Sequence, residues 1–536
     1  MARIHRNISF AAAESFGDIL HSGRTIEVRG KSTKELTNRV TVLERPLERF
    51  LFLPGRLNDV FAQVAETLWV LNGRDDLEWL VRYLPRAFEF SDDGKTWRAA
   101  YGPRLRRWKG TVDQLAEVRA LLTQDRSSRR AVMALFDPAL DYGQSLDIPC
   151  NNWLSWLIRD DALHLSVALR SNDAFWGFSG TNAFEWSVLH ELMAGWTGTR
   201  VGSATFFATS FHLYEHHFGR ALKVTERFHS ISPYDFGVQQ TPIVIPGEGF
   251  DRELARWFDA EAVVRSDPDR APFEMSDPFL SGALALVRLK WGSEGWGVSR
   301  LRSELSALPD SDMAAAAYDH FGRNTSGILE GIAQPAVARF FAACGNGKAT
   351  PASTNLLADA IKALHLRKDR DYGGAWKRRG EQVSVLPNIA RKVDRLETFL
   401  DSGRESMDET LLDTAIDLYV YAQKYRLFLE DDGDPSLPLP RGGEPPSSDE
   451  ACFDALVDLD NLADGVGDPR DAMRRAIDLF EGVWKRSASG ATLDERRASA
   501  ASLAEASGKV VATLARERPA IAGKFVTMEL HGSHAS

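Results

Sequence analysis

The chain has 536 residues, of which 44% are hydrophobic and 26% are charged, a balance typical of a globular protein with more than one domain. The net charge of −10 disfavours bulk nucleic-acid binding. Three widely spaced cysteines argue against a disulfide framework and for a reducing compartment. No segment has the apolar length of a membrane span and the N-terminus lacks a signal-peptide core, so we expect no membrane association and a cytoplasmic protein.

The first informative element is a helix predicted over residues 60–71 and closed by Asn72-Gly73. Glu66 lies in it among apolar neighbours. A carboxylate that is partly buried in this way has the tuned pKa that a general acid or base needs. The alternative is a helix glutamate that simply reaches solvent.

Residues 131–136, 153–158 and 163–169 read as strands, and residues 159–161 read as the turn between the last two. Such a hairpin places Arg170-Ser171 beside Cys150, which begins the first of its strands. A guanidinium group donates hydrogen bonds to phosphate oxygens, and its charge favours the thiolate form of a neighbouring cysteine. Cys150 is therefore a candidate nucleophile, although most free cysteines are inert core residues.

A strand-like run over residues 201–211 precedes His212 and Tyr214, and residues 277–291 and 310–321 read as amphipathic helices. Several motifs follow one another within roughly residues 20 to 240: Glu66-Thr67-Leu68-Trp69, Tyr101-Gly102, Ser128-Arg129-Arg130, Pro149-Cys150, Arg170-Ser171-Asn172-Asp173, Gly177, Asn182 and His212-Leu213-Tyr214. Their order and spacing resemble those of the thymidylate synthase and pyrimidine (dCMP, dUMP, CMP) hydroxymethylase superfamily.

The resemblance implies an α/β fold, with a thymidylate synthase-type mixed β-sheet domain and flanking helices followed by all-α helical domains. It also implies one-carbon transfer from 5,10-methylenetetrahydrofolate to C5 of a pyrimidine nucleoside 5′-monophosphate, through addition of the Cys150 thiolate at C6. The family forms an obligate homodimer in which Arg129 and Arg130 would reach the partner's phosphate site.

Residue roles follow from the same motifs. The catalytic residues would be Cys150, Glu66, Tyr101 and Asn182; the substrate-binding residues Arg29, Arg129, Arg130, Arg170, Ser171, His212 and Tyr214; and the folate-binding residues Asp173, Gly177 and Phe88.

The Asn182 amide can accept from N3–H and donate to O4 of uracil, which favours dUMP as the substrate. Asn182 could instead cap the helix that begins near it. The segment from Gly177 to Asn182 also has one residue more than the family pattern.

Other departures from the family pattern lie where water access and hydride transfer are decided. Asn151 stands where histidine is common, Phe88 where an indole is usual, Ser210 where an acid is usual, and Asp147 where an apolar residue is usual. Capture of the exocyclic intermediate by hydride would give methylation, and capture by water would give hydroxymethylation. The sequence leaves both products open.

A second group of motifs consists of Arg370-Asp371-Tyr372-Gly373-Gly374-Ala375-Trp376, residues 388–397 and residues 408–421. These motifs resemble the all-α nucleotide-modification-associated domains related to nucleotide pyrophosphohydrolases. Asp394 with Glu397, and Asp413 with Asp417, each share a helix face and could hold Mg²⁺ if the two faces were opposed. Solvated acids on two amphipathic helices are the alternative.

We therefore expect a catalytic domain over 1–250, a helical extension over 251–350, an all-α domain over 351–430, a linker over 431–450 and a helical segment over 451–536. Two alternative functions remain. One is a metal-dependent nucleotide pyrophosphohydrolase in the helical part, with the front domain only binding nucleotide, and the other is a non-catalytic nucleotide sensor.

Overall fold

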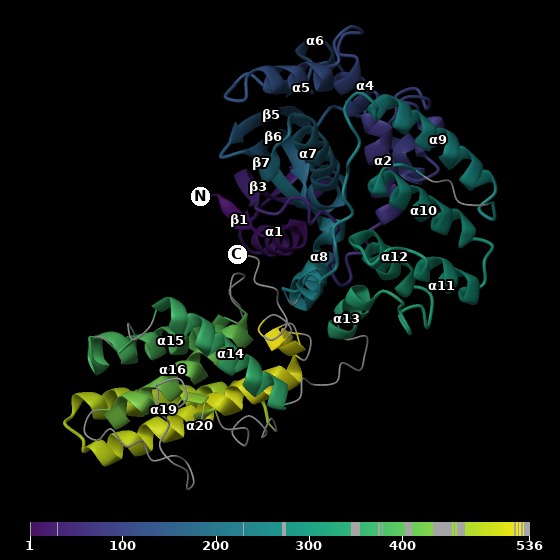
Figure 1. Ribbon diagram of the computed structural model, residues 1–536. Coiled ribbons are helices and arrows are strands. Elements are labelled where there is room, and N and C mark those ends of the chain that lie inside the picture. Colours follow the sequence, from purple (N-terminus) through teal and green to yellow (C-terminus); the bar gives the residue numbers. More distant parts are fainter. Residues whose placement is uncertain are drawn as a thin grey trace. The chain divides into compact units, whose positions relative to one another are not determined.

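The computed structural model contains two compact units, residues 1–228 with 232–338, and residues 339–536 with 229–231 (Figure 1). The residues it describes are 2–28, 30–228, 230–270, 275–344, 354–372, 376–377, 379–402, 410–431, 453–454, 456–457, 467–518, 521–523, 525–526 and 529. The predicted linker lies almost wholly outside these residues. The finer boundaries at residues 250, 350 and 430 stay predictions.

The first unit is built on a mixed seven-stranded sheet with the order β1-β3-β7-β6-β5-β4, with β2 also paired to β3. The predicted fold class is confirmed: β6 and β7 pair in parallel, and β5 pairs antiparallel with both β4 and β6. The strands are β1 (Arg3–His5), β2 (Arg24–Val28), β3 (Lys31–Leu43), β4 (Val132–Ala134), β5 (Asn151–Arg159), β6 (Ala162–Asp173) and β7 (Arg200–Tyr214).

The β5–β6 hairpin forms where the sequence predicts it. Its turn uses Asp160 and Asp161, both with positive φ, a conformation that aspartate tolerates better than most residues. Because β6 then runs parallel to β7, the carboxyl ends of both strands lie beside the start of β5. Residues from these three strands therefore meet at one end of the sheet.

Helices flank the sheet. Asp59 caps α2 (Val60–Leu71) by accepting from the backbone N–H groups of Phe61 and Ala62, both at 3.1 Å, so the predicted helix around Glu66 is confirmed. The other helical elements up to residue 236 are α1 (Ile8–Ser22), α3 (Leu77–Leu80), η1 (Pro85–Phe90), α4 (Tyr101–Arg106), α5 (Gln114–Gln124), α6 (Pro138–Asp141), η2 (Ala174–Asn182), α7 (Ala183–Thr197), α8 (Glu215–Arg227) and η3 (Pro233–Phe236).

One face of the sheet is open among the described residues. Trp153, Ala168 and Phe207 are register partners on the adjacent strands β5, β6 and β7 and therefore form one row. Trp153 is 41% and Phe207 39% exposed, and Val132, on the same face of β4, is 48% exposed. Large exposed apolar groups in one row are characteristic of an interaction surface.

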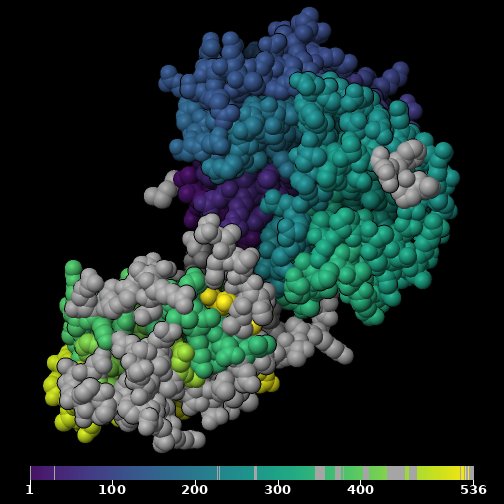
Figure 2. Space-filling model, in the orientation of Figure 1, coloured from purple at the N-terminus to yellow at the C-terminus, as the bar shows by residue number. Residues whose placement is uncertain are grey.

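Further helices complete the first unit. In Figure 2 their teal surface adjoins the blue surface of the part that contains the sheet. The predicted helices at 277–291 and 310–321 are confirmed within two residues. The elements are α9 (Phe250–Ser266), α10 (Pro278–Gly292), α11 (Val298–Ser306), α12 (Asp312–Gly322) and α13 (Pro335–Ala343), the last of which crosses the unit boundary.

The second unit is helical in its described part and has its own apolar core, which includes Leu412, Tyr419 and Leu503. Its elements are α14 (Thr354–Tyr372), η5 (Glu381–Val385), α15 (Leu386–Ser402), α16 (Leu411–Asp431), α19 (Pro469–Ala488) and α20 (Leu493–Glu517). Across the described residues of both units, each helix is too short or too polar to cross a bilayer.

Candidate active site

Cys150 lies directly before β5, and its neighbour across the hairpin is Arg170. The backbone N–H of Arg170 donates to the carbonyl of Cys150 at 3.0 Å, and Nη2 of Arg170 lies 3.8 Å from Sγ. The same guanidinium donates to the carbonyls of Pro149 (2.9 Å) and Ile148 (2.8 Å). The thiol is part-exposed, so the structure places a reachable sulfur beside a fixed positive charge.

Tyr101 and Asn151 also lie near the thiol. The Asn151 amide donates to the Tyr101 hydroxyl oxygen at 2.5 Å, and its own oxygen accepts from the indole of Trp186 on α7 at 3.1 Å. Burial, and to a lesser extent the negative charge of the Cys150 thiolate, raise the pKa of Tyr101 well above its usual value. Tyr101 therefore stays a neutral hydroxyl beside Cys150.

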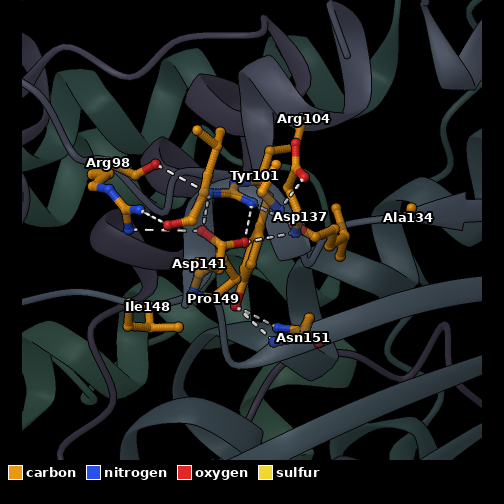
Figure 3. Close-up of polar contacts among 12 residues, drawn as sticks. Arg98, Tyr101, Arg104, Ala134, Asp137, Asp141, Ile148, Pro149 and Asn151 are labelled. Atoms are coloured by element: carbon orange, nitrogen blue, oxygen red, sulfur yellow. Dashed lines mark hydrogen bonds and ion pairs between the residues drawn. The ribbon is translucent and has the colours of Figure 1, made fainter. Parts of the chain in front are cut away.

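A buried ion pair holds the segment that carries Tyr101. Nη1 and Nη2 of Arg104 donate to the two carboxylate oxygens of Asp141 at 2.7 and 2.9 Å, and Nη1 also donates to the Leu135 carbonyl at 2.6 Å. Figure 3 shows this pair next to the contact between Tyr101 and Asn151. Arg104 lies one helical turn after Tyr101, so the ion pair fixes the position of the tyrosine.

Glu66 enters the site from α2. Its carboxylate accepts from the Thr181 hydroxyl at 3.2 Å. Burial raises the pKa of Glu66 to about 7, with a further increase from the negative charge of Asp147 and an opposing effect of the Thr181 hydrogen bond. Burial likewise raises the pKa of Asp147 to about 6. Two carboxyl groups that titrate near neutrality thus lie close enough to influence each other.

The segment with the extra residue forms η2, which is a π-helix and leads directly into α7. A π-helix accommodates one additional residue within a helical path, and such turns are frequent at functional sites. Asn182 has helical dihedral angles (φ −60°, ψ −43°) and makes no capping hydrogen bond, so the capping alternative is wrong. A Cβ on Gly177 would lie 2.6 Å from Oδ1 of the buried Asn172, which explains the glycine.

Asp173 and His212 are register partners at the ends of β6 and β7. Asp173 accepts from the backbone N–H of Phe175 at 2.9 Å, and burial raises its pKa against the opposing charge of His212. The rings of His212 and Tyr214 lie 5.2 Å apart at 90°. Tyr214 also lies under the ammonium group of Lys31 at 5.7 Å.

Ser210 stands where the family pattern has an acid, and its hydroxyl donates to Glu35 on β3 at 2.6 Å. A carboxylate is therefore present at this position, supplied by the adjacent strand. Ser171 is the register partner of Ser210, so it lies at the same end of the sheet.

Two predicted arginines lie away from the residues around Cys150. Arg129 and Arg130 are exposed and precede β4, whose register with β5 places them at the far end of β5 from Cys150. Within one chain the pair is therefore remote from the thiol. Arg29 lies outside the described residues, and Phe88 is a 58% exposed ring in η1.

The predicted magnesium site finds no support in the second unit. Asp394 and Glu397 are exposed because the core-facing positions of α15 are Val393 and Leu396. The residues that the structure describes contain no group of three or more histidine, cysteine or acidic side chains arranged to hold a metal ion.

Asp417 is neutralised by protein cations. Its oxygens accept from Lys368 at 3.0 Å and from Lys392 at 2.6 Å, and these charges lower its pKa although burial opposes them. Asp413 accepts from the hydroxyl of Thr410 at 2.8 Å. Both carboxylates thus have other partners than a divalent cation.

Four side chains near the residues described above were not predicted as site residues. Asp147 and Asn151 were identified only as departures from the family pattern, whereas Glu185 and Glu35 were not predicted. Glu185 lies in the first turn of α7, is 1% exposed, and has a pKa raised by burial and by the charge of Glu66. Its spacing from Asn182 could have indicated a shared helix face.

Comparison with known proteins identifies a family model and several relatives that are similar to this chain. The family model described as "Thymidylate synthase" matches residues 14–236.

Three phage proteins, each named "Deoxyuridylate hydroxymethyltransferase", are similar to the chain. The protein of Bacillus phage SP01 is 35% identical over 237 residues, which cover 42% of this chain and 61% of that protein. The protein of Pseudomonas phage M6 is 32% identical over 284 residues, 51% of this chain and 79% of that protein. That of Delftia phage PhiW-14 is 34% identical over 206 residues, 36% of this chain and 57% of that protein.

These relatives and the sheet-end cluster define a transferase-type domain in the first unit. The chain belongs to the thymidylate synthase family.

Replacement of Asp141 by alanine should destabilise the first unit by about 3 kcal/mol, because it leaves the buried Arg104 guanidinium without its counter-charge. Urea denaturation measures this loss. Glu89→Ala is the control: it removes the exposed ion pair with Arg86 and should leave stability nearly unchanged. Equal effects of the two substitutions would contradict the proposed support of the Tyr101 segment.

Proposed function

We propose that this protein transfers a one-carbon unit from 5,10-methylenetetrahydrofolate to C5 of dUMP. The observation that carries the proposal is the part-exposed Cys150 thiol with the Arg170 guanidinium 3.8 Å from its sulfur. C5 of uracil is a poor nucleophile, and addition of a thiolate at C6 turns it into an enolate-like carbon that attacks an electrophile.

The remaining residues have distinct tasks in this proposal. Asn182 pairs with N3–H and O4 of uracil. Glu66, with a pKa of about 7, exchanges protons with the pyrimidine through an ordered water, where the neutral Tyr101 hydroxyl assists.

Residues at the carboxyl ends of β6 and β7 bind the phosphate and the sugar in this proposal. Arg170 and Ser171 donate to the phosphate. Nη1 of Arg170 has no hydrogen bond to any part of the chain that the structure describes, so it is available to an anion. His212 and Tyr214 hold the sugar.

The cluster fits a folate that supplies the one-carbon unit. Phe88 offers an exposed aromatic face for the pterin ring, and Asp173 offers a carboxylate to its N–H groups. Gly177 lies on the segment directly after Asp173 and leaves room there.

The names of the three phage relatives favour hydroxymethylation over methylation. Three phage proteins that are 32% to 35% identical to the chain are named for hydroxymethyl transfer to deoxyuridylate. We therefore propose that water, and not hydride, completes the reaction of this protein.

We also propose a homodimer formed through the open face of the sheet. The row of Trp153, Ala168 and Phe207 offers an apolar surface, and Arg129 and Arg130 lie at one end of β5, remote from the thiol of their own chain. In a dimer these arginines would reach the phosphate bound by the partner.

Cys150→Ala should abolish release of tritium from [5-³H]dUMP in the presence of methylenetetrahydrofolate, because C5 is not activated without addition at C6. Binding of dUMP, measured by calorimetry, should persist. Cys344→Ala removes the other described thiol and should retain full activity. Tritium release by Cys150→Ala at the wild-type rate would exclude Cys150 as the nucleophile.

The rate of tritium release should rise with pH between 6 and 8. The carboxylate form of Glu66 accepts the proton, and with a pKa of about 7 this form is lost as the pH falls. Glu66→Gln should lower the rate by about 10²- to 10⁴-fold and remove this part of the pH profile. An unchanged profile in Glu66→Gln would assign the titration to another group.

Trp153→Asp should convert the dimer to monomers in sedimentation experiments, because the substitution places a charge in the apolar row. Arg129→Ala/Arg130→Ala and Cys150→Ala should each be inactive alone, but mixed dimers should regain activity through one intact shared site. A monomeric wild-type protein, or the absence of complementation, would refute the shared site.

A further inference from the structure

Glu185 is a buried carboxyl group that the proposed function does not use. It is 1% exposed, and among the described residues its Oε1 atom has no hydrogen-bond partner. A buried polar oxygen without a partner is unfavourable by comparison with an apolar side chain of the same size, so it requires an explanation.

The surroundings of Glu185 are those of the reacting centre. Helices α2 and α7 pack together, and the Glu66 charge raises the pKa of Glu185, as burial does to a greater extent. Thr181, four residues before Glu185, donates to the Glu66 carboxylate at 3.2 Å. Trp186, the next residue, donates to Asn151 at 3.1 Å. The charge of Glu185 also raises the pKa of Tyr101.

Burial raises the pKa of both glutamates. The pKa of Glu185 lies well above its ordinary value, whereas that of Glu66 is about 7, with Asp147 as a further nearby carboxyl group. Burial thus favours the protonated form of Glu185, which has one donor and one acceptor, and Glu66 with a pKa of about 7 is ionised in about half of the molecules at neutral pH. A water molecule between them would donate to one group and accept from the other.

We propose that Glu185 and Glu66 together hold the water molecule that captures the one-carbon unit, and that Glu185 is the residue that selects the hydroxymethylated product. This inference rests on the proposed function, because it concerns the fate of the intermediate that Cys150 forms.

The step balances without an oxidant or a reductant. After the folate has left, the pyrimidine carries an exocyclic methylene at C5 and the Cys150 sulfur at C6. The water oxygen forms a bond to the methylene carbon, and its proton passes to the Glu66 carboxylate. The electron pair of the exocyclic double bond moves to C5 and O4, then forms the C5–C6 double bond as the C6–S bond breaks. Thiolate is regenerated and the product carries a hydroxymethyl group.

The experiment uses the full chain, dUMP and methylenetetrahydrofolate, and measures two quantities for each variant: the rate of tritium release from C5 and the masses of the nucleotide products. In Glu185→Leu, which cannot hold the water, formation of hydroxymethyl-dUMP should fall at least about tenfold while tritium release changes little. Glu185→Gln keeps a donor and an acceptor and should restore most of the product.

Two controls separate positioning of water from a structural effect. Glu191→Gln changes the same functional group on the same helix, where its partners are Arg49 and the backbone N–H of Ile243, and it should not alter the product ratio. Affinity for dUMP should be equal in Glu185→Leu and in the wild type.

The outcomes distinguish the two proposals. A wild-type protein that releases no tritium would refute the proposed function, and this inference with it. Tritium release that yields only methylated nucleotide would overturn this inference and leave one-carbon transfer in place. Wild-type formation of hydroxymethyl-dUMP that is equally fast in Glu185→Leu would overturn the role of Glu185 alone.

Discussion

The pairing of β5 with β6 is the constraint on which the site depends. It brings Cys150 and Arg170, twenty residues apart in sequence, into direct backbone contact at 3.0 Å. The same guanidinium holds the carbonyls on the N-terminal side of the cysteine, so the thiol and the positive charge cannot move independently. The parallel pairing of β6 with β7 then adds Asp173 and His212 at the same end of the sheet.

Around this end of the sheet, the fold buries groups that would be better hydrated. Glu66, Asp147 and Glu185 all have raised pKa values because burial disfavours their charged forms. Such groups reduce stability, and apolar packing elsewhere in the unit compensates for them. Perturbed carboxyl groups near one reactive thiol are characteristic of a catalytic centre.

Much of this arrangement could be predicted from the sequence. The helix around Glu66 and the hairpin after Cys150 have strong local periodicity, and local patterns determine local structure. The neighbours of Glu185 could not be predicted, because they come from α2 and α4, about 120 and 80 residues earlier in the chain. The predicted magnesium site finds no support for a related reason. The spacing of Asp413 and Asp417 identifies a shared helix face but not the lysines from α14 and α15 that bind Asp417.

The π-helix η2 has a consequence for how this chain is compared with its relatives. One inserted residue would turn the following part of an α-helix by about 100° around its axis, and the wider π-turn takes up the extra residue so that α7 keeps its direction. The π-turn ends at Asn182, and Glu185 and Trp186 follow it in α7. An alignment that places the gap a few positions away would therefore equate residues that point in different directions, and substitutions transferred from a relative would land on the wrong side of the helix.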